Sequence, residues 1–136
     1  MTYLLDTNVA IALIKGQPKD VRERLQSAIQ SGIRVAVSTI TVHELWFGVA
    51  KSAKQDENAR RLKAFLSGDV TVLDFNSDAA AISGAIRATL KRRGTPIGPY
   101  DLLIAGQAIS ANATLVTANT AEFMRVDGLT LVDWTV

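Results

Sequence analysis

The sequence predicts an α/β fold, a three-layer sandwich with a mostly parallel central sheet. Short β-rich runs alternate along the chain with longer segments whose apolar residues recur at helical spacing. The chain has 136 residues, 48% of them hydrophobic, which suits one domain with one real core over residues 1–136. No internal repeat, low-complexity tract or linker interrupts this order. Strands that alternate with helices favour a parallel sheet.

The first half of the chain predicts two strands and four helices. Residues 2–5 form a strand that ends at Asp6, and residues 8–15 form a helix closed by Gly16. Helical spacing returns over residues 20–32, and a β-rich run covers residues 33–38. Two further helices are expected over residues 41–53 and 57–68.

The second half continues the same alternation. A strand over residues 70–75 precedes a helix that Ser77 can cap and that stops at Gly94. Pro99 fits the first turn of the next helix, which runs through residues 102–110. A strand over residues 113–117, a short helical turn over 119–124 and a final strand over 129–134 complete the prediction.

The composition excludes several classes of protein. The chain has no cysteine, so disulfides and thiolate zinc sites are excluded and a cytoplasmic setting fits. It has no long uncharged apolar run of membrane-spanning length, and its first residues lack the basic region of a secretory signal. The net charge of +2 is compatible with a polyanionic partner but too small to indicate one.

Four polar residues fall at or just beyond the carboxyl ends of predicted strands, where functional groups of parallel sheets gather. Asp6 ends the first strand, Glu44 lies in the first turn of the helix after the second, Asp101 opens an apolar helix, and Asn119 follows a later strand. Carboxylates in one place repel each other unless a cation neutralises them, and oxygen ligands suit Mg²⁺ or Mn²⁺. A hydrated divalent ion of this kind suggests phosphodiester hydrolysis.

Each of these residues also has a purely structural interpretation. Asp6 can cap a helix, Thr41 and Glu44 match a capping box, and Asp101 suits the first turn of a helix through its dipole. Asn119 can be a turn residue. Four independent structural roles that happen to fall at one sheet edge explain the pattern less well than one functional site does. The two interpretations are also compatible, because an acid at a helix start can still hold a metal.

Other chemistries are less consistent with the sequence. His43 is the only histidine, and helical geometry turns it about 100° away from Glu44, so we interpret it as structural or partly exposed. Zinc hydrolase and Cys-His protease readings therefore lose support, and no nucleotide-binding P-loop motif is present. Trp46 and Phe47 are expected in the core or in an interface rather than as base-stacking platforms.

Four stretches together resemble the PIN-domain ribonucleases, and specifically the VapC toxins of bacterial toxin–antitoxin pairs. They read "LLDTNV", "STITVHELWFG", "GTPIGPYDLLIA" and "LVTANTAEFMRVDGL", and the resemblance covers nearly the whole chain. It implies a single PIN-like domain, a Mg²⁺-dependent endoribonuclease and a homodimer. It also implies a VapB-type antitoxin that blocks the site and binds operator DNA, so that this chain reaches the DNA only through the antitoxin. Structured RNAs such as tRNA are among the candidate substrates.

The resemblance carries site residues over position by position. Asp6, Glu44 and Asp101 become the acidic triad that holds the metal, with Thr7, Asn8 and Thr117 as supporting groups and Asn119 as a further catalytic position. Many relatives place a fourth acid where this chain has Asn119, which puts a second metal in doubt because asparagine adds no negative charge. Glu122, one helical turn on, could substitute for that acid.

The basic side chains of the helix before "GTPIGPYD" are candidate phosphate contacts: Arg87, Lys91, Arg92 and Arg93. A plain solvated face explains the same spacing.

Two rival functions stay open. One is an aspartate-nucleophile phosphatase using Asp6, although the second acid it needs is replaced by Asn8. The other is a catalytically weak PIN-like subunit that acts by binding its antitoxin and DNA.

Overall fold

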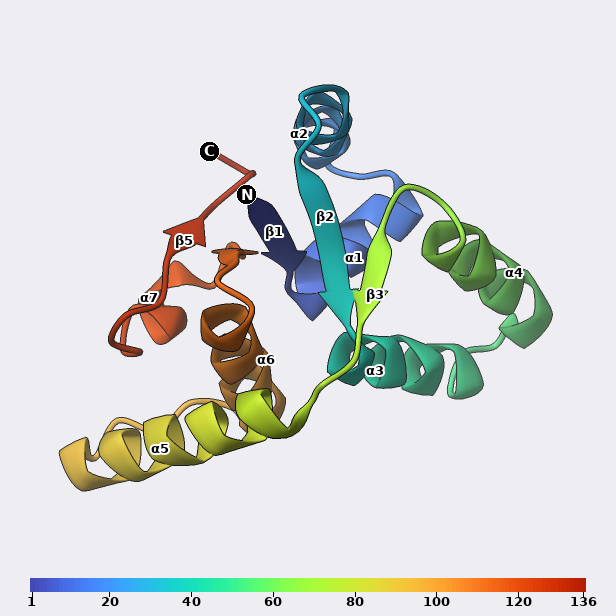
Figure 1. The fold of residues 1–136 in the computed structure, drawn as a ribbon. Helices are drawn as coiled ribbons and strands as arrows, with labels where there is room; N and C mark the ends of the chain where they lie inside the picture. Colours follow the sequence, from blue (N-terminus) through green and yellow to red (C-terminus); the bar gives the residue numbers. More distant parts are fainter.

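The fold is built on a five-stranded sheet in which every neighbouring pair of strands is parallel (Figure 1). The computed structural model describes residues 1–136, and the strand order is β3-β2-β1-β4-β5. The strands are β1 (Thr2–Leu5), β2 (Arg34–Ser38), β3 (Thr71–Leu73), β4 (Thr114–Val116) and β5 (Leu131–Val132). The predicted α/β class with a mostly parallel sheet is confirmed.

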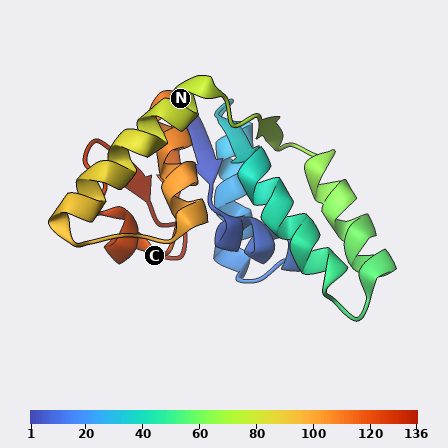
Figure 2. The ribbon, with the colours of Figure 1, turned by 90° about the horizontal axis from the view of Figure 1, so that it is seen from below.

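Helices cover both faces of the sheet. They are α1 (Thr7–Lys15), α2 (Lys19–Gln30), α3 (Thr39–Ala50), α4 (Gln55–Leu66), α5 (Ser77–Arg93), α6 (Pro99–Ser110) and the short α7 (Thr120–Phe123). Figure 2 shows α3 and α4 on one side of the strands and α5 and α6 on the other. No helix is both long enough and apolar enough to cross a membrane.

The alternation of side chains along the strands divides the apolar interior into two cores. In β1, Leu5 packs with residues of α1 to α4, whereas its neighbour Leu4 packs with residues of α5 to α7. Val116 and Leu115 divide in the same way in β4. Successive residues of a strand point to opposite faces, so both faces of this sheet must be apolar and covered. The three layers follow directly from that pattern.

Two helix starts differ from the prediction. Asn76, not Ser77, caps α5, because its side chain accepts a hydrogen bond from the Ala79 amide at 2.9 Å. Ser38 caps α3 through the Ile40 amide, so that helix begins earlier than expected. Glu44 therefore lies in the second turn of α3 rather than the first, and the expected capping box does not form. Where several residues in a row can cap, local backbone geometry selects among them.

The order in which the strands are connected creates a point beside β1 where the direction of the chain through the sheet reverses. The chain moves from β1 outward through β2 to β3, and then returns past β1 to β4 and β5. The arrowheads of β1, β2 and β3 all point to the same edge in Figure 1. Parallel sheets form crevices at the carboxyl ends of their strands where the strand order reverses. Here that point lies beside β1, the strand that ends at Asp6.

Candidate active site

Asp6 lies at the centre of this edge and is only 4% exposed. Its carboxylate caps α1 by accepting a hydrogen bond from the Val9 amide at 2.8 Å. The Thr117 hydroxyl also donates to it from the end of β4. Burial raises the pKa of Asp6 above its usual value, and Glu44 adds to this, whereas the bonds from Thr117 and Val9 oppose it. Asp6 is thus both the predicted helix cap and a buried acid beside another acid.

Glu44 approaches from α3 and is fixed by hydroxyl groups. The Thr7 hydroxyl donates to Glu44 Oε1 at 2.7 Å and lies 3.2 Å from the hydroxyl of Thr41, which is fully buried. The Thr41 side chain therefore supports the cluster instead of capping a helix. Thr7, predicted as a supporting residue, connects α1 to α3 at this point.

Asp101 enters from the first turn of α6, as predicted. Its pKa is raised to about 6 by burial first, and then by the negative charges of Glu122, Asp6 and Glu44. No lysine or arginine lies within ion-pair distance of it. The structure therefore brings the three predicted acids into one electrostatic cluster, although they come from α3, α6 and the end of β1.

Asn119 and Glu122 form a connected pair at the side of the cluster. The Asn119 side-chain amide donates to Glu122 Oε2 at 2.9 Å, and the Gly98 backbone amide donates to Oε1 at 2.7 Å. These two bonds, Gly98 first, lower the pKa of Glu122 and keep it ionised. Asn119 thus orients an acid, and Glu122 supplies a negative charge near Asp101, as the fourth acid of the expected pattern would.

The chemistry of the cluster suits a hard divalent cation. Its charged groups are all carboxylates, and hydroxyl and amide groups orient them. None of the four acids, Asp6, Glu44, Asp101 and Glu122, forms an ion pair within 4.0 Å. Yet no three acids are grouped tightly enough to enclose an ion on their own. The residue types fit Mg²⁺ or Mn²⁺, with water completing its coordination, as Mg²⁺ commonly requires.

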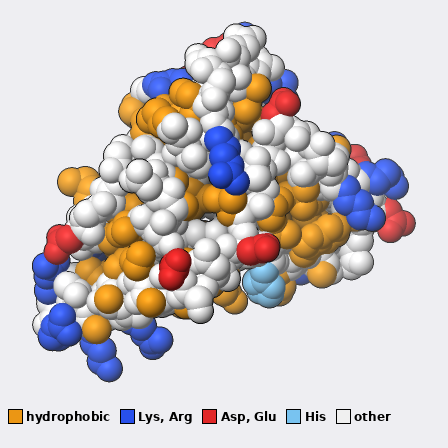
Figure 3. All heavy atoms as spheres, viewed as in Figure 1, with side chains coloured by type: hydrophobic (Ala, Val, Ile, Leu, Met, Phe, Trp, Pro, Cys, Tyr) orange, Lys and Arg blue, Asp and Glu red, His pale blue; other side chains and the backbone are white.

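The predicted phosphate contacts divide into two groups. Arg87 and Lys91 line a groove between α5 and α6 that also includes Pro99, two residues before Asp101. Arg93 instead pairs with Asp127 at 2.7 Å, and Arg92 bonds Thr89. Figure 3 shows the basic side chains gathered over the far tip of α5, at the lower left. Of the basic residues on α5, Arg87 and Lys91 are therefore the two that lie beside α6, the helix that carries Asp101.

Sequence reasoning missed an aromatic rim next to the acids, formed by His43, Phe47 and Tyr100. Trp46 is 36% exposed and Phe47 60% exposed, so neither lies in the core; the alternative expectation, a position in an interface, stays a prediction. His43 is exposed, as expected, but its ring lies 5.8 Å from that of Tyr100, the residue before Asp101. It also lines one cavity together with Glu44, against the expectation that it would face elsewhere. A cavity wall can include adjacent helix residues, which a simple 100° rotation argument overlooks.

Comparisons with known proteins agree with this geometry. Residues 3–129 match the PIN domain. The tRNA(fMet)-specific endonuclease VapC of Salmonella typhimurium is 41% identical over 134 residues, covering 98% of each chain, and Ribonuclease VapC2 of Rickettsia felis is 39% identical over the same span. One chain of the VapBC2 structure of Rickettsia felis, solved bound to a promoter DNA fragment, superposes with a TM-score of 0.93 and 38% identity, covering 98% of this chain and 99% of that chain.

These relatives are about 40% identical to the chain over almost its full length, and the solved relative has the same fold. Both findings identify the family. The chain belongs to the PIN-domain family and, within it, to the VapC ribonucleases.

Proposed function

We propose that this protein is the ribonuclease toxin of a VapBC toxin–antitoxin pair, that it hydrolyses RNA phosphodiester bonds with Mg²⁺ or Mn²⁺, and that tRNA is its substrate class. The observation that carries the proposal is the convergence of Asp6, Glu44 and Asp101 at one sheet edge without a basic partner. Asp6 is buried and Glu44 and Asp101 are half-buried, and unpaired acids in such positions are unfavourable to folding, so their presence favours a functional role. The substrate class rests on the relative whose name specifies tRNA(fMet).

Asp6 and Asp101 would hold the cation directly, and Glu44 would bind it or orient a water molecule at its edge. A divalent ion bound there would supply charge stabilisation for the phosphate and a water of lowered pKa. Thr7 fixes the Glu44 carboxylate, and Thr117 fixes that of Asp6, so the donor atoms need little ordering. Glu122, oriented by Asn119 and Gly98, adds negative charge beside Asp101.

Arg87 and Lys91 would contact backbone phosphates of the RNA on the α6 side of the cluster. Such contacts provide affinity without sequence preference. For partners, we propose a VapB-type antitoxin, a homodimer, and contact with operator DNA only through the antitoxin. Support comes from the VapBC complexes among the solved relatives, some of them bound to DNA.

The decisive test is cleavage of total RNA by the purified protein with Mg²⁺, Mn²⁺ or EDTA, followed by mapping of the cut ends. We expect discrete cuts that require the metal, and their loss in Asp6→Asn and Asp101→Asn proteins that keep the parent's circular dichroism. Near-normal metal-dependent cleavage by Asp101→Asn would contradict the site assignment. An intact parent that cleaves no RNA under any of these conditions would favour a non-catalytic role.

A further inference from the structure

The cavity that His43 and Glu44 line has a volume of about 560 Å³ and lies directly beside the acids. Its wall combines Thr7 and Asn8 at the start of α1, Tyr100 at the start of α6, and one side of α3. It shares Glu44 with the acid cluster, so any molecule that fills it also reaches the site. The remaining wall residues are Ile11, His43, Phe47, Gly48 and Lys51.

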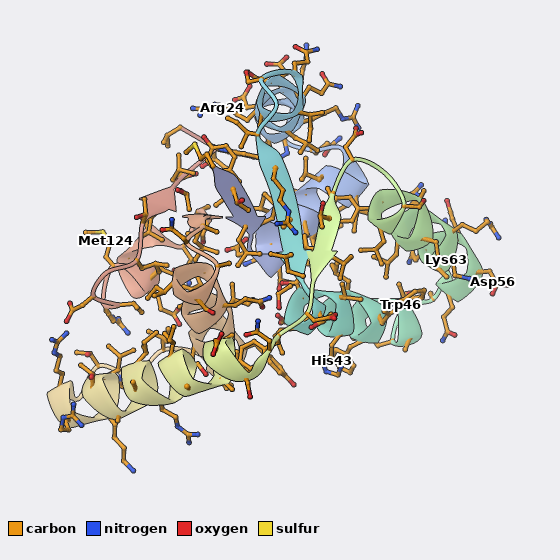
Figure 4. All side chains as sticks on the ribbon, in the orientation of Figure 1. Arg24, His43, Trp46, Asp56, Lys63 and Met124 are labelled. Atoms are coloured by element: carbon orange, nitrogen blue, oxygen red, sulfur yellow. The ribbon has the colours of Figure 1, made fainter.

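Two aromatic rings stand at this cavity one residue away from site acids. His43 precedes Glu44 on α3, and Tyr100 precedes Asp101 on α6. Their ring centroids are 5.8 Å apart and the planes are inclined by 52°, so the rings do not stack face to face. Tyr100 is 45% exposed. Both side chains are exposed and line the cavity, so a flat molecule entering it would contact aromatic surface. Figure 4 shows the labelled His43 side chain projecting outward from α3.

A third ring lies one turn further along α3, at Phe47, and a cation follows at Lys51, the residue that caps the end of this helix. The Lys51 ammonium is 4.9 Å from the centre of the Phe47 ring, and both side chains are exposed. Lys51 forms no ion pair within 4.0 Å. Its positive charge faces a cavity whose one acid is Glu44. Along α3 from Glu44, the cavity therefore presents first an aromatic ring and then the Lys51 ammonium, which has no acidic partner.

The geometry points to a nucleotide-binding subsite: a base of single-stranded RNA next to the cleaved phosphate packs on Tyr100 and His43, and the following phosphate is contacted by Lys51. This inference rests on the proposed ribonuclease function. Aromatic faces bind single-stranded bases without regard to sequence, and a cation beside them follows the backbone. The cavity wall is mostly apolar, with Thr7, Asn8, Glu44 and Lys51 as its polar or charged members, and a nucleotide uses both kinds of contact.

Binding of RNA without cleavage tests this subsite. The protein carries Asp6→Asn to prevent hydrolysis, and the probe is a short single-stranded oligoribonucleotide with 4-thiouridine at successive positions. Irradiation followed by mass spectrometry should place crosslinks on His43, Phe47 or Tyr100. In titrations, Tyr100→Leu should weaken binding about 5- to 100-fold, as expected for loss of one stacked base. Tyr100→Phe keeps the ring and should bind within about twofold of the parent, since stacking needs only the ring.

The cation has its own readout and a matched control. Lys51→Gln should reduce the slope of log Kd against log salt by about 0.7, the contribution of one phosphate of a single strand. Lys63→Gln, at an exposed position on α4 away from this cavity, should leave that slope unchanged. For the rings, Phe47→Leu should weaken binding, and Trp46→Leu, on the same helix but outside the cavity wall, should not.

The outcomes separate the subsite from the function. If Asp6→Asn protein binds RNA normally but crosslinks elsewhere, and Tyr100→Leu binds as tightly as Tyr100→Phe, the subsite is wrong and the ribonuclease proposal stands. If no RNA binds at all and cleavage is also absent, both fail. If Phe47→Leu or Tyr100→Leu leaves RNA binding unchanged but lowers the mass of the particle in solution, the rim is an interface between copies and the subsite is overturned.

Discussion

Asp101 carries the clearest electrostatic signature of the site. Burial and three neighbouring acids raise its pKa to about 6, and no basic side chain offsets them. At neutral pH its carboxylate is mostly ionised, so the repulsion is present in the folded protein when no cation is bound. A helix-dipole role for Asp101 alone would predict a stabilising charge instead.

The pH dependence of stability in EDTA follows from this shift. The folded pKa of about 6 exceeds the unfolded value of 3.8, so between them the folded protein holds more protons. The contribution of Asp101 to stability is therefore lost as pH rises through this window. Compared with Asp101→Asn, the parent should become less stable from about pH 4 to about pH 7, by roughly 1 kcal/mol after allowance for solvent screening. Urea unfolding of both proteins across this range checks it, and a constant difference would refute the shift.

Asp6 combines two roles that different substitutions separate. Asparagine can still accept the hydrogen bond from the Val9 amide, whereas alanine cannot. We expect both Asp6→Asn and Asp6→Ala to lose cleavage, and Asp6→Ala to be about 1 kcal/mol less stable than Asp6→Asn. Denaturant unfolding in EDTA measures the difference. Equal stability of the two variants would show that the cap contributes nothing.

At the residue scale, the positions of the acids could be predicted from the sequence, because the ends of strands and the starts of helices have local sequence signals. It did not place Glu122 near Asp101, since that proximity depends on the bonds that join Pro96 and Gly98 to Arg125 and Glu122. The hydrogen bond from the Gly98 amide fixes this approach, and a glycine amide leaves no sequence signal. The exposed rings of Phe47 and Tyr100 were missed for a related reason, because periodicity cannot show which helix face finds no neighbour.

At the scale of elements, α5 and α6 pack extensively on each other and approach most closely at Gly106. A Cβ atom added at Gly106 of α6 would lie 2.7 Å from the Ser83 Cβ and 2.9 Å from the Ser83 backbone nitrogen. Atoms of the backbone cannot move aside cheaply, so α5 would have to shift. This packing supports α6, which carries Asp101 into the site, and α5, which carries Arg87 and Lys91.

A pair of glycine substitutions tests that contact. Gly106→Ala should destabilise the protein by about 1–3 kcal/mol, as overpacking does in well-packed interiors. Gly84→Ala, within α5, meets nothing within 4 Å and should be neutral or stabilising by up to about 1 kcal/mol through helix propensity. Thermal unfolding of both variants gives the comparison. A Gly106→Ala protein as stable as Gly84→Ala would mean that the two helices pack less tightly than described.

The elements themselves were mostly predictable, and their ends were not. Short apolar runs between the helical segments indicated every strand. Such runs are expected because both faces of a covered parallel sheet are apolar. The starts of α3 and α5 shifted because Ser38 and Asn76 were available as caps beside the predicted Thr41 and Ser77. The earlier start of α3 places Glu44 in the second turn, where the Thr7 hydroxyl still donates to its carboxylate at 2.7 Å.

At the scale of the whole molecule, the acid cluster is also a site that a partner can block. We expect the antitoxin to inhibit by placing a basic side chain, an arginine, among these carboxylates. A guanidinium matches a carboxylate through two hydrogen bonds and competes with a cation for the same charge. Inhibition of RNA cleavage by purified antitoxin should therefore weaken as Mg²⁺ is raised at constant ionic strength. Inhibition that ignores Mg²⁺ would point to steric blockage away from the acids.

Growth arrest tests the same cluster in the cell. The protein expressed without its antitoxin should arrest growth by cutting RNA, and Asp6→Asn expressed to the same level should not. Asp6→Asn is preferred to Asp6→Ala here because asparagine preserves the helix cap. Viable counts after induction, with immunoblots for expression, give the answer. Equal toxicity of the Asp6→Asn protein would favour a function that does not depend on hydrolysis.

The central claim, that these carboxylates form a divalent-cation site, is tested most directly by unfolding with and without Mg²⁺. The free energy of unfolding is measured for the parent and for Asp101→Asn in EDTA and in Mg²⁺. The parent should gain stability clearly, by about 2.7 kcal/mol at a hundredfold excess of Mg²⁺ over Kd. The variant, more stable than the parent in EDTA at neutral pH, should gain much less. Equal gains from Mg²⁺, with the variant less stable than the parent in EDTA, would contradict the site and leave Asp101 as a helix-start residue only.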